Sequence, residues 1–212
     1  MENERFERRS YNFEIRAEQT DEYGVIEGRA IVYGSRSDMG YFDEVIAFGA
    51  LDRTNLKDVR FLVNHDLSRI PLARSRNNNA NSTMQLIKDE FGLRVRVKLD
   101  VERNAEARSL YSAVERGDIS GMSFMFAIDS EEWANLDTEH PMRTITSIAQ
   151  VIEVSAVTFP AYEDTEINVR NKSALESARL ALESARSSSP DGEKRTNELE
   201  LLKAKTKLLG GL

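Results

Sequence analysis

Short segments in which apolar and polar residues alternate fill most of the chain between residues 11 and 159, and they constrain the fold more than any other feature. Val95, Val97 and Leu99 alternate with Arg96 and Lys98, as expected of a half-buried strand, because successive side chains point to opposite faces of a sheet. Further strands are predicted at residues 11–32, 42–46, 59–64, 84–87, 119–128 and 144–159. The chain is therefore expected to fold mainly as β-sheet.

Two helices are expected between these strands. Apolar positions in residues 104–116 recur with the spacing of one helix face: Ala105, Leu110, Ala113 and Val114. Gly117 follows as a suitable residue to end this helix in a left-handed conformation. Residues 47–55 are predicted to form a second, shorter helix.

Composition divides the 212 residues into one core domain and two extensions. Residues 1–10 are predicted as a charged N-terminal arm, and residues 11–170 as the core domain, which is long enough to bury a hydrophobic core. Residues 171–212 are predicted as a helical C-terminal extension that lacks the apolar content for a core of its own.

The C-terminal extension contains a short repeat. The sequence LESAR at residues 175–179 recurs seven residues later, a spacing that favours a surface or coiled helix, although two copies do not establish a coiled coil. A break at residues 187–192 and a second charged helix at 193–209 are expected to follow. We interpret the extension as a partner-binding segment, and the alternative is a solvated helix.

Charge and composition argue against several classes of function. A net charge of −7 and a pI of about 5.1 argue against nonspecific nucleic-acid binding. The absence of cysteine removes thiol nucleophiles, disulfides and cysteine-ligated zinc. The remaining candidate ligands have no metal-binding spacing and no phosphate-binding glycine loop is present, so neither a metal nor a cofactor is expected. No apolar stretch approaches membrane-spanning length, so no membrane partner is expected.

Only two histidines are available for acid–base chemistry near neutral pH. His65 directly follows the predicted strand 59–64, which can hold an imidazole ring rigidly. His140 lies in a polar, turn-like stretch before Pro141 and is expected to be exposed. His65 is therefore the better candidate for a general base, and a histidine that only hydrogen-bonds within the fold is the alternative.

Two further segments carry residues that could react with or orient such a histidine. The predicted strand 119–128 contains both Ser120 and Ser123, and a serine hydroxyl becomes nucleophilic only beside a base. Glu153 interrupts an apolar strand, where a buried carboxylate needs a partner. That partner is either an imidazole, which the carboxylate would orient, or an arginine. Ser155 is expected on the same strand face as Glu153.

Five segments, taken together and in this order, resemble the prohead proteases of tailed double-stranded DNA phages, a family related to the herpesvirus assemblins. They lie within residues 13–169 and read EGRAIVYG (27–34), EVIAFGAL (44–51), NHD with IPLAR (64–66 and 70–74), GDISGMSF (117–124) and EVSAVTFPA (153–161). The resemblance implies an α+β fold with a mainly antiparallel β-barrel core, surrounding helices and a helical C-terminal extension.

The resemblance also implies a serine endopeptidase that cleaves scaffold segments of the major capsid protein, and itself, inside the immature prohead in the host cytoplasm. It implies Ser123 as nucleophile, His65 as general base and Glu153 as the orienting third residue. Ser120 is the alternative nucleophile and His140 the alternative third residue. Oxyanion donors are expected near Ala73 and Arg74 or near Gly121. The rival classes are a non-catalytic scaffold or capsid-assembly protein with a protease-like fold, and another hydrolase such as an esterase.

Overall fold

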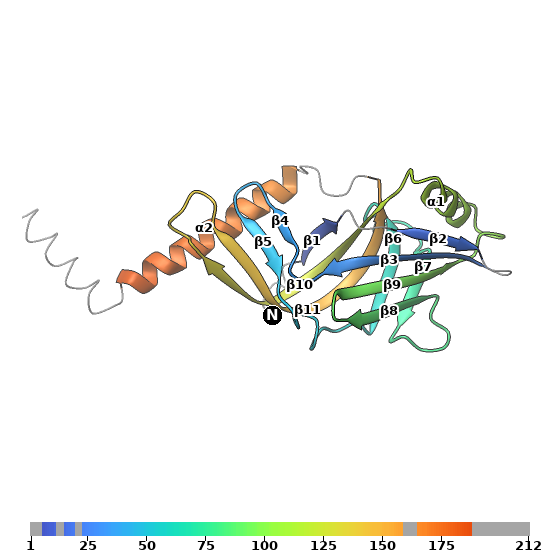
Figure 1. Cartoon of the computed structure of the whole chain (residues 1–212), viewed down its shortest axis with the longest axis horizontal. Coiled ribbons are helices and arrows are strands. Elements are labelled where there is room, and N and C mark those ends of the chain that lie inside the picture. Colours follow the sequence, from blue (N-terminus) through green and yellow to red (C-terminus); the bar gives the residue numbers. More distant parts are fainter. Residues whose placement is uncertain (1–5, 12–14, 20–22, 159–164, 188–212) are drawn as a thin grey trace, which may run out of the picture.

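The computed structural model describes residues 6–11, 15–19, 23–158 and 165–187, and this part of the chain has a mixed α+β fold with many strands and two helices (Figure 1). The strands of the N-terminal half are β1 (Phe6–Tyr11), β2 (Arg16–Gln19), β3 (Gly24–Val32), β4 (Arg36–Asp38), β5 (Asp43–Ile46), β6 (Asp58–Val63), β7 (Ala73–Arg76), β8 (Met84–Asp89) and β9 (Gly92–Leu99). They are followed by helix α1 (Ala105–Glu115), strands β10 (Gly121–Ala134) and β11 (Met142–Val157), and helix α2 (Thr165–Ser187).

Two sheets form the core of the described chain. The larger sheet has the order β1-β10-β11-β5-β4, and β6 also pairs with β11 and carries β7 on its other side. The smaller sheet has the order β2-β3-β9-β8. Because β11 is 16 residues long, it pairs in parallel with β5 near its start and with β6 near its end. The other strand pairs of the described chain are antiparallel.

The β-barrel expected from the sequence is wrong for the described residues, which form two sheets that do not close on each other. Strand β10 has β1 on one edge and β11 on the other, and β3 lies between β2 and β9. The two sheets therefore contact each other through side chains and not through backbone hydrogen bonds between further strands. Gly28 of β3 permits this approach, since a Cβ atom there would lie 2.8 Å from the Met122 sulfur of β10.

The predicted helix over residues 47–55 is also wrong. These residues form successive turns, in which the N–H groups of Ala50, Asp52 and Thr54 each donate to the carbonyl three residues earlier. Gly49 interrupts any helix because its φ is +80°, in the left-handed region. The Thr54 hydroxyl then donates to the Ile148 carbonyl at 2.8 Å, so that the turns pack on β11.

Local predictions made for the rest of this region are confirmed. Residues 84–89 and 92–99 form the expected hairpin. The helix predicted at 104–116 is α1, with Asn104 as its N-cap, whose side chain accepts from two backbone N–H groups. Gly117 ends the helix at a φ of +79°. Leu110 and Val114 of the predicted stripe are buried.

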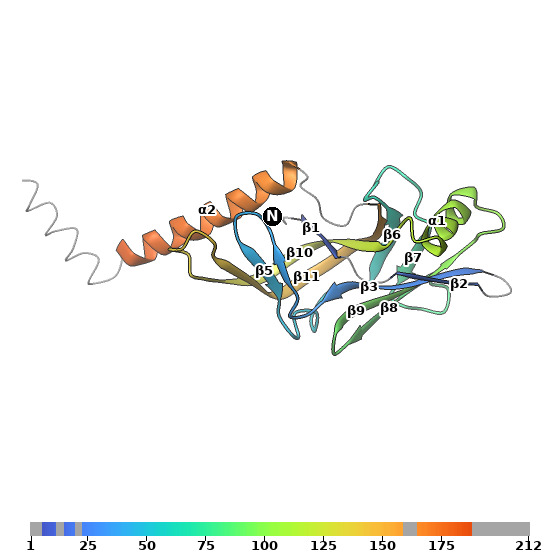
Figure 2. The same cartoon turned by 45° about the horizontal axis from the view of Figure 1, so that its top comes forward.

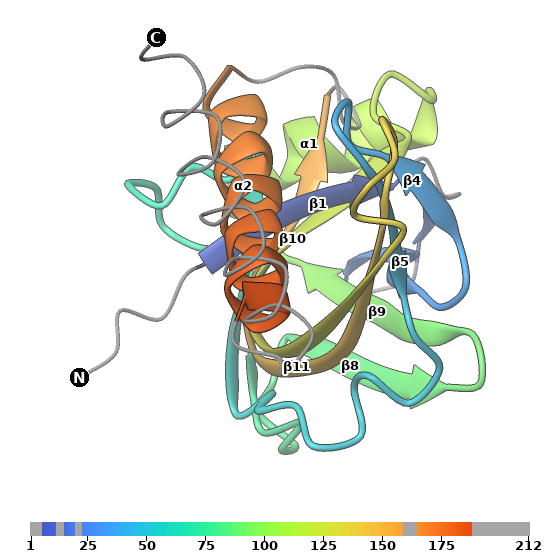
Figure 3. The same cartoon turned by 90° about the vertical axis from the view of Figure 1, so that its left-hand side faces the viewer.

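Helix α2 lies against the larger sheet at the opposite end of the molecule from α1 (Figure 2). Asn171 donates to the Met39 carbonyl beside β4, and Arg179 donates to the carbonyls of Leu136 and Thr138 at the tip of the β10–β11 hairpin. Figure 3 views the molecule from this end, with α2 in front. No helix of the described residues is long and apolar enough to span a membrane.

Some predictions about the chain ends lie partly or wholly outside the described residues. Residues 6–10 of the predicted charged arm belong to β1, which pairs with β10. The predicted extension begins inside α2. Its expected second helix at residues 193–209 lies outside the described residues, as does the break from residue 188 on. The division into arm, domain and extension stays a prediction.

Candidate active site

Three of the predicted site residues come together where β6, β10 and β11 meet. Glu153 and Ser155 are two residues apart on β11, so their side chains share one face of the sheet. Ser123 lies directly opposite Ser155 in the β10–β11 register. These three side chains are fully buried, at 0% exposure. The adjacent residues Phe124 and Val154 point to the other face and belong to the hydrophobic core.

The position of His65 depends on an unusual turn after β6. Strand β6 runs parallel to β11 and ends at Val63, opposite Ala156. Asn64 and His65 then adopt φ values of +51° and +59°, a left-handed conformation that costs roughly 1–3 kcal/mol for a residue other than glycine. Asn tolerates this conformation better than most residues. The two residues turn the chain so that the His65 ring lies over Ser123 and Glu153.

Hydrogen bonds to the end of β11 hold this turn. The Asn64 N–H donates to the Ala156 carbonyl at 2.9 Å. The Asn64 side chain bonds with Thr158 in both directions, accepting from its N–H and donating to its hydroxyl, each at 3.0 Å. The His65 N–H donates to the Ser155 hydroxyl oxygen at 3.1 Å. The strained backbone is therefore fixed by several partners on one strand.

The His65 ring lies between a carboxylate and a hydroxyl. Its Nδ1 is hydrogen-bonded to Glu153 Oε1, and its Nε2 lies 2.5 Å from Ser123 Oγ. The second carboxylate oxygen, Glu153 Oε2, accepts from the Ser155 hydroxyl at 2.6 Å. With a proton on Nδ1 shared with Glu153, the Nε2 lone pair faces Ser123 and can accept its proton. The ring is nearly enclosed, since its side chain is 12% exposed.

A further contact to Ser123 comes from β1, which the sequence did not indicate. The Ser123 hydroxyl donates to the backbone carbonyl of Arg9 at 2.8 Å, and Ser10 lies opposite Ser123 in the β1–β10 register. Residues 9 and 123 are 114 positions apart, so no local pattern could have revealed this pairing. The hydrophilic sequence of β1 gave no strand signal.

The alternative site residues lie elsewhere. Ser120 is exposed and precedes β10. The His140 Nε2 atom lies 3.3 Å from Asp43 and 3.8 Å from Asp38. These three residues could present one ligand atom each to a metal, but Asp43 is also paired with Arg36.

Asp58 pairs with two arginines near the site, one of which, Arg74, was expected near the oxyanion donors. Arg60 lies opposite Glu153 in the β6–β11 register, yet its guanidinium bonds to Asp58 at 3.3 Å. The Arg74 guanidinium bonds to Asp58 at 2.6 and 2.8 Å. The Arg74 N–H donates to the Thr83 hydroxyl, so this amide, expected near an oxyanion site, has a partner within the fold.

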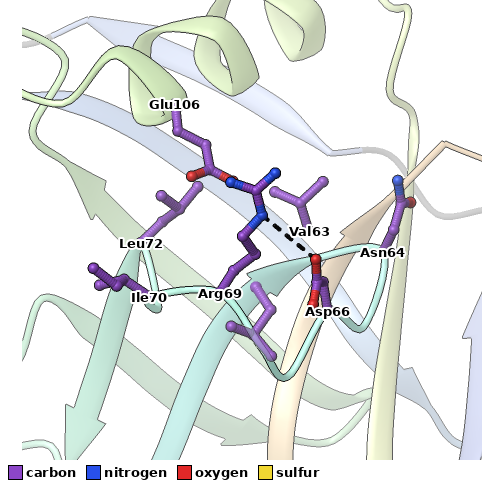
Figure 4. A pocket seen from close by; sticks show the side chains of 8 residues that line it. Val63, Asn64, Asp66, Arg69, Ile70, Leu72 and Glu106 are labelled. Atoms are coloured by element: carbon purple, nitrogen blue, oxygen red, sulfur yellow. Dashed lines mark ion pairs between the residues drawn. The ribbon is translucent and has the colours of Figure 1, made fainter.

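A pocket of about 200 Å³ opens beside the turn that carries His65. Its lining residues come from the end of β6, the following loop and the first turn of α1 (Figure 4): Leu62, Val63, Asn64, Asp66, Arg69, Ile70, Leu72 and Glu106. Ile70 at its rim is 83% exposed. This apolar and polar lining is typical of a cleft that holds part of a larger ligand.

A buried carboxylate, an imidazole and a serine hydroxyl in series form the arrangement that serine hydrolases use for acyl transfer. The chain belongs to the caudovirus prohead serine proteases, because the sequence profile of that family matches residues 11–179. The resemblance inferred from the five sequence segments is thereby confirmed.

Two known proteins have similarity to this chain. The chain is 26% identical over 157 residues to the prohead protease of Enterobacteria phage HK97, a match that covers 73% of this chain and 63% of that protein. The chain therefore spans less than two thirds of that relative's length. It is also similar to the bacteriophage T4 capsid assembly protease, gp21, with a TM-score of 0.42 and 10% identity over 72% of this chain and 96% of the T4 chain.

Proposed function

We propose that the chain is a serine endopeptidase of phage prohead maturation, with Ser123 as nucleophile, His65 as general base and Glu153 as the orienting carboxylate. The observation that carries the proposal is the position of one imidazole between the other two groups, with Nε2 2.5 Å from Ser123 Oγ and Nδ1 on Glu153. Membership of the prohead serine protease family supports the same roles.

The chemistry follows from this arrangement. His65 Nε2 takes the Ser123 proton while Oγ attacks the scissile carbonyl, and the protonated ring then gives that proton to the leaving amine. Glu153 holds the ring in the required tautomer and stabilises the imidazolium that forms. Ser155 fixes both partners, since it accepts from the His65 backbone and donates to Glu153.

The proposed substrates are scaffold segments of the major capsid protein, together with the enzyme's own chain. The proposed location is the interior of the immature prohead in the host cytoplasm. A protease confined with its substrates works at a high effective concentration, so a modest intrinsic rate suffices. The part of helix α2 that belongs to the predicted extension presents the exposed residue Leu180 and is the proposed region for docking on a partner.

Coexpression with the major capsid protein tests the proposal. The Ser123→Ala variant is expected to fold, as judged by circular dichroism, and to leave the capsid protein at full length. Ser120→Ala is the matched control, because Ser120 is exposed outside β10, and it is expected to process normally. Normal processing by Ser123→Ala would exclude Ser123 as nucleophile, and an unprocessed capsid protein with the wild type would favour a non-catalytic assembly role.

A further inference from the structure

Strand β1 occupies the edge of β10 next to Ser123. Its register runs from Phe6 opposite Ala127 to Tyr11 opposite Met122, and it passes Ser123 on the way. Peptide ligands commonly bind by adding a strand to a sheet edge of this kind. Since Ser123 is 0% exposed, an extended peptide from another molecule reaches it along this edge only after β1 has left.

The carbonyl of Arg9 lies with its oxygen against the nucleophile. Acyl transfer requires Oγ to come within about 3–3.5 Å of a carbonyl carbon, whereas here the Arg9 carbonyl oxygen lies 2.8 Å from Ser123 Oγ and accepts its hydrogen bond. A serine hydroxyl has one proton, so a bond donated to Arg9 withholds that proton from His65 Nε2. The contact therefore describes a resting state in which β1 engages the nucleophile without reacting.

The Arg9 side chain enters a buried acidic subsite. Its guanidinium makes a bidentate pair with Glu44, through Nε to Oε1 and through Nη2 to Oε2 at 2.6 Å. The side chains of Arg9 and Glu44 are 5% and 1% exposed. Bidentate, charge-assisted pairs of this kind are both strong and geometrically selective for arginine.

The charges that remain without β1 would still favour a cation. Arg143, at 3% exposure, bonds to Glu44 at 3.1 Å and also to Glu131. Its other partner is Glu7, which belongs to β1 and leaves with it. Glu44, Glu131 and Arg143 then carry one net negative charge, and a buried uncompensated charge is costly. A basic side chain in a substrate would neutralise this charge, and it could pair with Glu44 as Arg9 does in the resting state, where Glu7 of β1 offsets the charge of Arg9.

Building on the proposed function, we propose that the edge of β10 is the substrate groove, that β1 blocks it in the resting state, and that the Glu44 subsite selects arginine or lysine in the substrate. The selected residue is the one whose carbonyl Ser123 attacks. The Ser123 Oγ–carbon bond forms and the bond to the following nitrogen breaks. His65 transfers the hydroxyl proton to that nitrogen, and water later hydrolyses the ester.

A reversible crosslink in the full chain tests whether β1 blocks the groove. Because the chain has no cysteine, Phe6→Cys with Ala127→Cys creates a single possible intramolecular disulfide between residues that face each other across β1 and β10. Directly opposed strand residues fall within the Cα separation that a disulfide accepts. The oxidised form is expected to hydrolyse an arginine-containing peptide at least about tenfold more slowly than its reduced form, with Phe6→Cys alone as the control.

A peptide series tests the subsite in the wild-type chain. Peptides that differ only in one residue, Arg, Lys, Gln or Glu, are compared by kcat/KM, and the Arg peptide is expected to exceed the Gln peptide by roughly tenfold or more, since it gains a bidentate ion pair. Cleavage on the carboxyl side of that residue is expected by mass spectrometry. Glu44→Gln is expected to reduce the Arg preference.

The outcomes separate this inference from the proposed function. An active enzyme with equal rates in the oxidised and reduced crosslinked forms would overturn the blocking role of β1. An active enzyme with no preference for a basic residue would overturn the Glu44 subsite. If the wild type and the reduced variant hydrolyse no peptide and take up no fluorophosphonate at Ser123, the proposed function fails and this inference fails with it.

Discussion

The backbone N–H of His65 donates to the Ser155 hydroxyl oxygen at 3.1 Å. The same hydroxyl donates to Glu153 Oε2 at 2.6 Å. Ser155 therefore connects the backbone that carries the imidazole to the carboxylate that bonds to that imidazole, so the geometry of the proposed site depends on a residue outside the proposed triad.

Ser155→Ala tests this connection. Loss of the hydroxyl removes the hydrogen bond that fixes the Glu153 carboxylate and the one that holds the strained His65 backbone. We therefore expect kcat to fall by roughly ten- to a hundredfold with KM nearly unchanged, as for a lost positioning interaction. Ser130→Ala is the control, because Ser130 lies on an exposed part of β10 and its hydroxyl bonds to the Thr146 hydroxyl of β11. An equal effect in both variants, or a change in KM alone, would contradict a positioning role for Ser155.

Glu153→Gln removes the charge while nearly preserving the shape of the side chain. The neutral amide cannot stabilise the imidazolium and can impose the wrong tautomer on His65, so kcat is expected to fall by roughly 10³–10⁴-fold. The rate at which a fluorophosphonate modifies Ser123, followed by mass spectrometry of the intact protein, measures the loss of reactivity. His140→Gln is the control, because His140 lies beside Asp38 and Asp43 and not beside Ser123. In this variant Ser123 is expected to be labelled at the wild-type rate.

Asn64 is expected to matter through its backbone conformation. At a φ of +51°, Asn64→Ala should lower the free energy of unfolding by about 1–2 kcal/mol, because alanine is strained in this region. Asn64→Gly also loses the bonds to Thr158 but adopts the turn freely. Denaturant unfolding should therefore rank glycine above alanine at this position, and the reverse order would show that the side-chain bonds dominate.

The contact between β1 and the rest of the larger sheet should weaken in acid. Burial by itself raises the pKa of Glu7, but Arg9 and Arg143 outweigh it and lower that pKa from 4.5 to about 2. A lowered pKa in the folded state means that the ionised carboxylate stabilises the fold. This contribution, at most about 3 kcal/mol, is complete above pH 4.5 and is lost as the pH falls through about 2.

Hydrogen exchange of the β1 amides at pH 6 and pH 3 checks this prediction. Protection of β1 relative to β9 should fall at pH 3 in the wild type, because much of the Glu7 contribution is then lost. In Glu7→Gln, β1 should be less protected at pH 6 and should change less between the two values. Equal pH dependence in the two proteins would assign the effect to other carboxylates.

Much of the local structure could be predicted from the sequence, because strand alternation and helix capping depend on neighbouring residues. The β8–β9 hairpin and α1 follow from such patterns. Residues 47–55 were mispredicted because Gly49 and packing on β11 override their helical composition. The barrel was mispredicted because pairing of β10 with both β1 and β11 is a long-range choice.

The sequence by itself determined which reactive side chains exist: two histidines, no cysteine, and serines and a glutamate on strands. Only the tertiary structure decided which of them meet. The parallel pairing of β6 with β11 and the left-handed turn at Asn64 and His65 bring the ring to Ser123 rather than Ser120. The pairing of β1 with β10 likewise brings Arg9 to Ser123 from 114 residues away. Such contacts form when distant segments bury surface together, and no local pattern in the chain encodes their register.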